Sequence, residues 1–376
     1  MSKVLLYSSG IIAEEKPTGG ELRFLELARY LSQQAYAELC CADKEEALEP
    51  YGLHADIHMN ASDEMPTFLP EEARIWLANS RQLKKIARDN YTHVIVFDVP
   101  PAIGLVLSGV ENLILMVRKD LIGYERVKSK GKGLGKIARI VFQWLCEDLS
   151  LRCAKLVICQ CGYDRDVMMK RHPFQRGLSC KFRIQINNVN PSWIEDRASE
   201  ITAEKRGKNI FRVCFIGGFS DLRKGQDLFL KAARELTKKY EDIEFVLVGG
   251  GKSLQNYQVE YESEKIQFRG RMDNPMSVLK SADLLVVPSR ADSCPNTVME
   301  ALFTGIPVIG SRAGGIPEIL QDDEALFEAE YHAVRERIEH FYRDRSAYER
   351  LIENQHVRSR KLTFDWAEDM MNLILE

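Results

Sequence analysis

The stretch PSRADSCPNTVMEALFTGIPVIGSRAGGIPEIL, residues 288–320, decides the fold and raises a chemical question. It continues the apolar run DLLVVPS (283–289), passes through a helical pattern and enters a second apolar run, IPVIGS (306–311). Continuous apolar strands separated by a helix predict a parallel sheet that is covered on both faces. Two carboxylates, Asp292 and Glu300, follow the first of these strands. The question is what chemistry needs them there.

The same alternation of apolar runs and helical patterns extends along the whole chain, and it predicts two doubly wound, Rossmann-like α/β domains. A polar and charged stretch at 187–209 has the composition of a connector, which places the domain boundary near residue 190. The other predicted strands are KVLLYSS (3–9), HVIVFD (93–98), NLILMV (112–117), KLVICQ (155–160), RVCFIGG (212–218) and EFVLVGG (244–250).

Bulk composition excludes several classes of protein. A length of 376 residues suits two domains rather than one core. The net charge of −3 argues against a general nucleic-acid binder. The N-terminal MSKVLLYSSG is interpreted as a first strand and not as a signal peptide, and no apolar run reaches the roughly 18 residues of a membrane span. The nine scattered cysteines indicate reduced thiols in the cytosol.

Polar loops that follow two of the strands are candidate ligand sites. Gly19 and Gly20 open an amphipathic helix, where glycines let a ligand approach the backbone, although they also suit a plain turn. Arg223 and Lys224 precede another helix, and two cations at a helix N-terminus oppose the helix dipole. A bound anion would offset this unfavourable interaction with the helix dipole. The alternative is that the two cations are simply solvated.

The helix within 288–320 gives the strongest signal. Pro295 suits a first helical turn, so the N–H groups of Asn296 and Thr297 are expected to face a phosphate. A carboxylate beside an anion site would accept hydrogen bonds from hydroxyls or support a developing positive charge. Sugar hydroxyls together with a diphosphate meet both demands. The alternative for Glu300 is a capping or surface role.

Six further motifs accompany the stretch in a fixed order: TGGELRFLELARYL, INNVN, KGQDLFLKA, LVGGG, FRGRM and SADLLVVPSR. Together they resemble the retaining glycosyltransferases of family 4, which have the GT-B fold of two Rossmann-like domains facing across a cleft. The resemblance covers nearly the whole chain. It implies an acceptor-binding domain at 1–190, a nucleotide-sugar-binding domain at 191–360, and a last helix at 361–376 that crosses back to the first domain.

The same resemblance implies roles for individual residues. Glu300 would hold the donor ribose hydroxyls, and Asp292 stands where the family usually has a glutamate that contacts the transferred sugar. Lys224 would bind the donor diphosphate, helped by the Asn296 and Thr297 amides. The remaining implied contacts are Arg271 and Met272 along the nucleotide base, Gly218 and Phe219 in the donor site, and Gly19 and Gly20 beside the donor phosphates or the acceptor.

The chain departs from the family pattern at three places. Asp292 is one methylene shorter than glutamate. Phe219 occupies the place of the family's arginine, and Arg223 is the nearest cation to replace it. Many members carry a histidine after the strand that ends at residue 117, where this chain reads RKDLIGYER. Arg118, Lys119 or Asp120 therefore occupies the position of that histidine.

A basic segment, RVKSKGKGLGKIAR (126–139), contains six Lys and Arg and no acid, and the apolar IVFQWL follows it. A basic loop that leads into an apolar helix predicts contact with an anionic membrane surface through 126–145. An ordered acceptor-binding loop and a solvated loop are the alternatives.

The sequence therefore predicts a retaining hexosyltransferase, cytoplasmic or peripheral on the inner face of the membrane. It would use a UDP- or GDP-sugar and a glycan or lipid-linked acceptor of surface polysaccharide or glycolipid synthesis. No metal and no cofactor are expected, because Lys224 and helix N-termini would neutralise the leaving diphosphate. Two alternatives stay open: a glycosyltransferase of a small soluble acceptor, and a non-catalytic sugar-nucleotide-binding partner protein.

Overall fold

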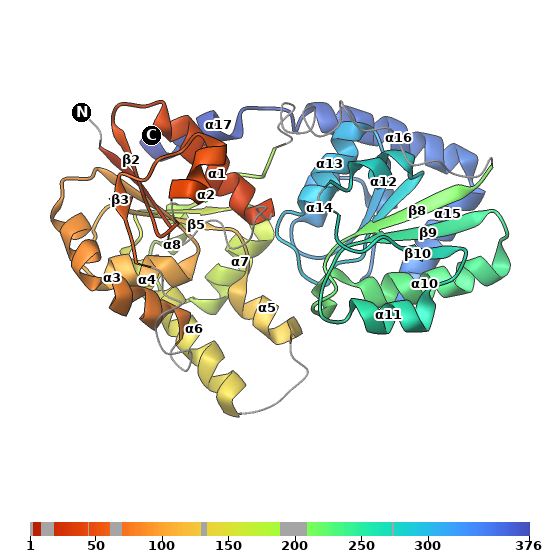
Figure 1. Ribbon diagram of the computed structural model, residues 1–376, viewed down its shortest axis with the longest axis horizontal. Helices are drawn as coiled ribbons and strands as arrows, with labels where there is room; N and C mark the ends of the chain where they lie inside the picture. The colour runs from red at the N-terminus through yellow and green to blue at the C-terminus, as the bar shows by residue number, and fades with distance from the viewer. Residues whose placement is uncertain are drawn as a thin grey trace. The chain divides into compact units, whose positions relative to one another are not determined.

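The computed structural model describes residues 3–8, 19–43, 45–60, 70–128, 134–188, 209–272 and 274–376. The chain divides into two compact units, each with its own parallel sheet (Figure 1). The first unit comprises Met1–Ile122, Gly131–Gln185 and Ala367–Glu376, and the second comprises Gly123–Lys130 and Ile186–Trp366. Most of the expected connector at 187–209 lies outside the described residues.

Within the described residues, the first unit has a seven-stranded sheet in the order β3-β2-β1-β4-β5-β6-β7, in which every pairing is parallel. This is the doubly wound order, with its reversal between β1 and β4. The strands are β1 (Val4–Tyr7), β2 (Ala37–Cys41), β3 (Ile57–His58), β4 (His93–Phe97), β5 (Leu113–Val117), β6 (Leu156–Cys159) and β7 (Phe182–Ile184).

Helices cover both faces of this sheet because alternate strand residues point to opposite sides. In β4, Val94 and Val96 belong to the core on the side of α3, α4 and α6, while Phe97 meets Phe24 of α1, with ring centroids 5.1 Å apart. The helices are α1 (Gly19–Ser32), α2 (Glu45–Leu48), α3 (Glu71–Arg88), α4 (Val99–Leu107), α6 (Leu134–Cys153), α7 (Gly162–Arg171), α8 (Leu178–Lys181) and α17 (Trp366–Leu375). Helix α5 (Leu121–Lys128) begins in the first unit, but most of its residues belong to the second.

The second unit repeats the same order, β10-β9-β8-β11-β12-β13, again with parallel pairings only among the described strands. In Figure 1, α10 and α11 lie on one side of this sheet, and α12 and α13 lie on the other. The strands are β8 (Phe211–Ile216), β9 (Ile243–Val248), β10 (Ile266–Phe268), β11 (Leu284–Val287), β12 (Val308–Ser311) and β13 (Leu326–Phe327). The helices are α10 (Gln226–Lys239), α11 (Leu254–Tyr261), α12 (Met276–Ser281), α13 (Asn296–Thr304), α14 (Ile316–Leu320), α15 (Tyr331–Arg343) and α16 (Arg345–Arg360).

The predicted fold class of two Rossmann-like α/β units is confirmed. Each apolar run chosen from the sequence contains a strand of the structure, and each of these strands begins or ends within two residues of the predicted bounds. Among the described residues, no helix is both long and apolar enough to cross a bilayer.

Candidate functional site

The second unit places its candidate site where the strand order reverses. β8 has β9 on one side and β11 on the other, so the chain leaves these strands in opposite directions. Ligands of doubly wound sheets bind outside the carboxyl ends of the strands at such a reversal. The loop after β8 carries Lys224, and the loop after β11 carries Asp292. Both residues singled out from the sequence therefore lie at this reversal.

Lys224 and Asp292 form an ion pair there. Lys224 Nζ and Asp292 Oδ2 are 2.5 Å apart. Asp292 is only 7% exposed, so its carboxylate has little water to stabilise its charge and relies on the ammonium group. The lysine side chain is 26% exposed and keeps one side open to solvent. Separate roles were predicted for the two residues, and the structure brings them into direct contact.

Two glycines allow main-chain segments to pack closely beside this ion pair. Gly225 has a φ of 71°, and a Cβ there would lie 1.9 Å from the carbonyl oxygen of Pro288. Gly314 has a φ of 58°, and a Cβ there would lie 1.9 Å from the carbonyl oxygen of Asp292. The Gly315 N–H donates to that same carbonyl at 3.0 Å. Only glycine fits such contacts, so the glycine pair after β12 fixes the main chain of Asp292.

The N-terminus of α13 begins shortly after Asp292. Pro295 is the residue before the helix, with φ −68°, and Asn296 is the first helical residue. The proline was expected within the first turn and stands one position earlier. Asn296 and Thr297 are the first two residues of α13, so no preceding helical carbonyl accepts a hydrogen bond from their N–H groups. These N–H groups lie at the helix N-terminus, which favours anions. The Asn296 side chain accepts a hydrogen bond from Asn187 Nδ2 at 3.3 Å.

Two other polar residues border this region. Glu300 is half-buried and lies in the second turn of α13, beyond the positions at which a side chain caps a helix. A capping role is therefore not supported. Ser293 is 2% exposed, and its hydroxyl has no hydrogen-bond partner among the described residues. Because buried polar groups are normally paired, this hydroxyl is a candidate partner for a bound ligand.

Arg223 lies beside the pair and is partly engaged. Its guanidinium lies over the ring of Tyr124, 4.6 Å from the ring centroid, and its Nε is 3.8 Å from Asp221 Oδ1. Arg290 supports the same turn, because its Nη1 donates to the Leu222 carbonyl at 2.7 Å and its N–H donates to the Arg223 carbonyl at 2.7 Å. Arg290 thus stabilises the turn that contains Arg223 and Lys224.

Phe219 does not present its side chain to this site. The ring is completely buried and contacts the rings of Phe215, Tyr257 and Phe268. Its contribution is restricted to the main chain, where its N–H donates to the Gly250 carbonyl at 2.9 Å. The place of the family's arginine is therefore filled by a core residue.

The remaining predicted donor residues lie around Gly250. A Cβ on Gly218 would lie 3.8 Å from the Gly250 carbonyl oxygen, and a Cβ on Gly250 would lie 3.3 Å from the Arg271 Cβ. Arg271 is exposed, whereas Met272 packs partly against the core. Gly218 follows β8, Gly250 follows β9, and Arg271 and Met272 follow β10, so these residues lie at the carboxyl ends of three neighbouring strands.

In the first unit, the predicted residues also follow strand ends. Gly19 and Gly20 open α1 as expected. Arg118 follows β5 and is held by Asp98, which follows β4: Asp98 accepts from Arg118 N at 2.9 Å, Nε at 3.1 Å and Nη2 at 2.8 Å. Asp98 has a φ of 67°, a conformation that few non-glycine residues adopt. Lys119 is half-buried and follows Arg118 directly.

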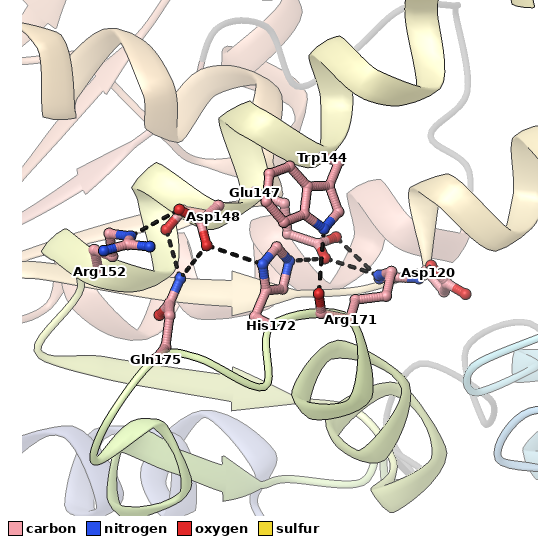
Figure 2. Close-up of polar contacts among 8 residues, drawn as sticks. All are labelled: Asp120, Trp144, Glu147, Asp148, Arg152, Arg171, His172 and Gln175. Carbon is pink, nitrogen blue, oxygen red and sulfur yellow. Dashed lines mark hydrogen bonds and ion pairs between the residues drawn. The ribbon is translucent and has the colours of Figure 1, made fainter. Parts of the chain in front are cut away.

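Asp120 points into a buried network of charges rather than toward open solvent (Figure 2). Asp120 Oδ1 is 2.6 Å from Arg171 Nη1. Arg171 also makes two bonds to Glu147, through Nε at 2.9 Å and Nη2 at 3.0 Å. Trp144 stacks on the ring of His172 at 5.1 Å between centroids. The network joins α6 to the end of α7 and to the loop after β5.

His172 lies at the centre of the network between two carboxylates. Its Nε2 is 2.8 Å from Glu147 Oε1, and its Nδ1 is 3.0 Å from Asp148 Oδ1. Partial burial would raise the pKa of Asp148, but hydrogen bonds from Arg152, Gln175 and His172 outweigh it and lower that pKa. Burial would lower the pKa of Arg171, whereas the neighbouring carboxylates raise it, so this guanidinium stays charged.

Metal-binding groups do not gather in the part of the chain that the structure describes. No cluster of three or more His, Cys, Asp or Glu side chains is placed to hold an ion there. The Asp-x-Asp triplet Asp164–Asp166 lies in the first turns of α7. Asp164 is 1% exposed, and Asp166 pairs with Arg165 at 2.7 Å.

Sequence reasoning missed several residues of these sites. Asp98 carried an available signal, because an acid at the carboxyl end of a buried strand is typical of a site residue. Ser293 lay between two residues that were chosen. Arg171 and Glu147 carried no signal, because they are 24 residues apart and only the packing of α6 on α7 brings them together.

Residues 210–344 match the family model described as "Glycosyl transferases group 1". This segment holds the Lys224–Asp292 pair, the start of α13 and the glycine contacts. The matched segment, residues 210–344, is similar to group 1 glycosyltransferases. It spans the second sheet from β8 to α15, so the family match rests on the unit that carries the candidate donor site.

Curated relatives match parts of the chain. N-acetyl-alpha-D-glucosaminyl L-malate synthase of Bacillus anthracis is 32% identical over 110 residues, which is 28% of each chain. UDP-Gal:alpha-D-GlcNAc-diphosphoundecaprenol alpha-1,3-galactosyltransferase of Escherichia coli is 25% identical over 196 residues, or 48% of each chain. The chain thus matches less than half of the length of these curated relatives.

Solved structures match the chain over its full length. The structure of HepE from Anabaena in complex with UDP and glucose has a TM-score of 0.71 at 16% identity and covers 100% of both chains. Identity at this level establishes the fold and not the substrate. The chain therefore has the GT-B fold, as predicted.

Proposed function

We propose that this chain is a retaining, metal-independent hexosyltransferase that transfers a sugar from a UDP- or GDP-sugar to a lipid-linked or glycan acceptor. The single observation that carries the proposal is the Lys224–Asp292 pair at the strand reversal of the segment that matches group 1 glycosyltransferases, directly before the N-terminus of α13. A cation, a helix N-terminus and a carboxylate gathered at one place suit a diphosphate that is attached to a sugar.

The chemistry follows from the charges of these groups. As the bond between the sugar and the diphosphate breaks, negative charge grows on the diphosphate and positive charge on the sugar ring. The Lys224 ammonium and the N–H groups at the start of α13 would stabilise the first charge, while Asp292 would support the second or bind a sugar hydroxyl. A diphosphate would compete with Asp292 for the lysine, which would release the carboxylate toward the sugar.

The relatives support a carbohydrate donor and leave two acceptor classes. The HepE structure contains UDP and glucose, and the Escherichia coli relative is named for a diphosphoundecaprenol acceptor. We favour a lipid-linked acceptor, with the enzyme on the inner face of the membrane and its product used in surface polysaccharide or glycolipid synthesis. The second candidate is a small soluble acceptor, which the name of the N-acetyl-alpha-D-glucosaminyl L-malate synthase relative favours.

The donor class can be tested by thermal shift with UDP-, GDP-, ADP- and dTDP-sugars, because ligand binding raises apparent stability by mass action. We expect a UDP- or GDP-sugar to raise the melting temperature. Slow donor hydrolysis followed by NMR should then release the sugar first in the anomeric form of the donor. An inverted product would contradict retention. Donor binding without hydrolysis or transfer would favour the non-catalytic sugar-nucleotide-binding partner protein.

Replacing Glu300 with alanine should weaken donor binding, because hydrogen bonds from ribose hydroxyls to a charged acceptor are lost. We expect a loss of about 1.5–3 kcal/mol in donor binding free energy, measured by titration calorimetry. Glu353→Ala, at an exposed position of α16, is the control and should bind the donor normally. Unchanged affinity in a folded Glu300→Ala protein would refute the ribose assignment.

A further inference from the structure

Arg223 differs from the other arginines that lie over aromatic rings in the described part of the chain. Its guanidinium carbon is 4.6 Å from the centroid of the Tyr124 ring, which is close enough for a cation–π interaction. The guanidinium makes no hydrogen bond to any described residue. Asp221 Oδ1 is 3.8 Å from its Nε, and this distance is too long for a hydrogen bond. The ring is therefore the main partner of this side chain.

The other arginine–aromatic contacts show what Arg223 lacks. In each of four further contacts among the described residues, the guanidinium also donates a hydrogen bond. These donors and acceptors are Arg29 to the Tyr51 carbonyl, Arg118 to Asp98, Arg234 to Glu260 and Arg345 to Glu349. A guanidinium has five N–H donors, which pair well with carboxylate or phosphate oxygens. Arg223 thus has hydrogen-bonding capacity that no described residue uses.

The main chain of Arg223 is held on both sides, so only its side chain remains to be oriented. Its N–H donates to Asp221 Oδ1 at 2.9 Å, and its carbonyl accepts from the Arg290 N–H at 2.7 Å. The turn then ends at Gly225, whose φ of 71° suits glycine. A long side chain on a fixed turn still has several rotatable bonds, and ordering them costs free energy when a ligand binds. The Tyr124 ring restricts these rotations before any ligand arrives.

Arg223 and its neighbour Lys224 differ in their availability to an anion. Lys224 Nζ is 2.5 Å from Asp292 Oδ2, so an anion must displace a carboxylate to reach it. Arg223 has no such hydrogen-bonded partner, and 27% of its side chain is exposed. A guanidinium in this state is suited to bind an anion, and its planar fork matches two phosphate oxygens at once.

Tyr124 belongs to the same unit as Arg223. It lies in α5, within the segment Gly123–Lys130 that clusters with the second unit, and it is half-buried. The predicted basic segment 126–139 follows it, and residues 129–133 of that segment lie outside the described residues. The contact between ring and guanidinium therefore adds a residue from far earlier in the chain to the candidate donor site.

We propose that Tyr124 is a positioning residue of the donor site, whose ring holds the Arg223 guanidinium ready for the diphosphate of the nucleotide sugar. Arg223 contacts the diphosphate in the ground state, before the Lys224–Asp292 pair separates. The arrangement supplies a second cation in a chain that has Phe219 at the place of the family's arginine. The inference rests on the proposed function, because it takes a nucleoside diphosphate as the ligand.

The first test is titration calorimetry of the full chain with UDP and with GDP, which carry the diphosphate without a sugar. Tyr124→Leu keeps an apolar side chain and removes the ring. We expect this variant to bind the preferred nucleoside diphosphate about three- to tenfold more weakly than the parent, because the ligand must then order the Arg223 side chain itself. Tyr124→Phe should recover most of the parent affinity, since phenylalanine keeps the face of the ring.

A double-mutant cycle tests whether Tyr124 acts through Arg223. Arg223→Ala should weaken nucleoside diphosphate binding by more than about tenfold, because hydrogen bonds between charged groups are lost. Adding Tyr124→Leu to Arg223→Ala should change the affinity by less than about twofold, since no guanidinium is left to position. The matched control is Tyr51→Leu, which removes another half-buried ring that an arginine covers, in the first unit, and should bind like the parent.

Steady-state kinetics with the donor gives a second readout. The ordered Arg223 side chain is needed in both the ground state and the transition state. Tyr124→Leu should therefore raise KM for the donor about three- to tenfold and leave kcat within about twofold of the parent. A loss of stability alone would lower the amount of active protein, and with it the apparent kcat, without raising KM.

Three results would overturn the inference. Tyr124→Leu could bind UDP and GDP as tightly as the parent while thermal unfolding shows a lower stability, which would make the contact purely structural. Its effect could persist in full without Arg223. Tyr124→Phe could bind as weakly as Tyr124→Leu, so that the ring face is not what matters.

The same measurements separate this inference from the proposed function. A parent that binds UDP or GDP but neither hydrolyses nor transfers a sugar would refute the proposed function, and the cycle of Tyr124 and Arg223 variants would still decide the inference. A parent that transfers sugar normally while Tyr124→Leu matches it in KM would refute the inference alone. A parent that binds no nucleoside diphosphate would refute both.

Discussion

Replacing Lys224 with alanine is expected to lower kcat by about 10²–10³-fold, because the ammonium group would stabilise the charge that grows on the leaving diphosphate. Donor affinity should fall much less, since that charge is smaller in the ground state. Steady-state kinetics and donor titration on the same protein separate the two effects. The loss should also leave Asp292 nearly buried without its cation, so thermal unfolding must be measured in parallel.

The control for this experiment is Lys231→Ala, at an exposed position on α10, which should retain the parent kinetics. Arg223→Ala is the informative companion. If Lys224→Ala turns over normally while Arg223→Ala does not, the diphosphate contact belongs to Arg223. That result would also answer whether Arg223 replaces the arginine whose place is filled by Phe219.

Replacing Arg171 with alanine is expected to destabilise the first unit by about 3–5 kcal/mol. The change leaves Asp120 and Glu147, which are 5% and 2% exposed, without the cation that neutralises them, and breaking a buried ion pair has this cost. Urea unfolding monitored by circular dichroism measures the effect. Arg171→Lys should restore only part of the stability, because lysine cannot make the two-pronged contact with Glu147.

The matched control is Arg165→Ala, which removes a half-buried arginine from the same helix. Its pair with Asp166 is largely solvated, so we expect a change of less than about 1 kcal/mol. Equal effects of the two alanine variants would contradict the view that the network of Figure 2 supports the loop that contains Asp120.

The strands that the sequence revealed are the central ones, and the reason is their burial on both faces. β1, β4, β5 and β6 are continuous apolar runs. β2 was not predicted, because Glu38 interrupts its series of apolar residues. The Glu38 carboxylate accepts a hydrogen bond from Tyr91 and forms an ion pair with Lys3. β7 contains an exposed arginine, Arg183, and β3 and β13 have only two residues each. Short or half-polar strands carry too few residues to show a period.

The candidate site was predictable as a set of residues and not as a set of contacts. Lys224 and Asp292 were both evident as polar residues after buried strands. Their ion pair depends on two backbone approaches at Gly225 and Gly314, which the sequence shows only as glycines. The direction of Asp120 depends on Arg171, which lies 51 residues away. Long-range partners of this kind follow from tertiary packing, which no local pattern encodes.

The pairing of Lys224 with Asp292 has a consequence for discrimination between anions. A lysine that already has a carboxylate partner offers little net attraction to a small free anion such as inorganic phosphate, which gains one contact and must displace another. A nucleotide sugar brings a base, a ribose, two phosphates and a hexose, so its many simultaneous contacts can exceed the cost of separating the pair. We therefore expect inorganic phosphate to bind this site much more weakly than a complete nucleotide sugar.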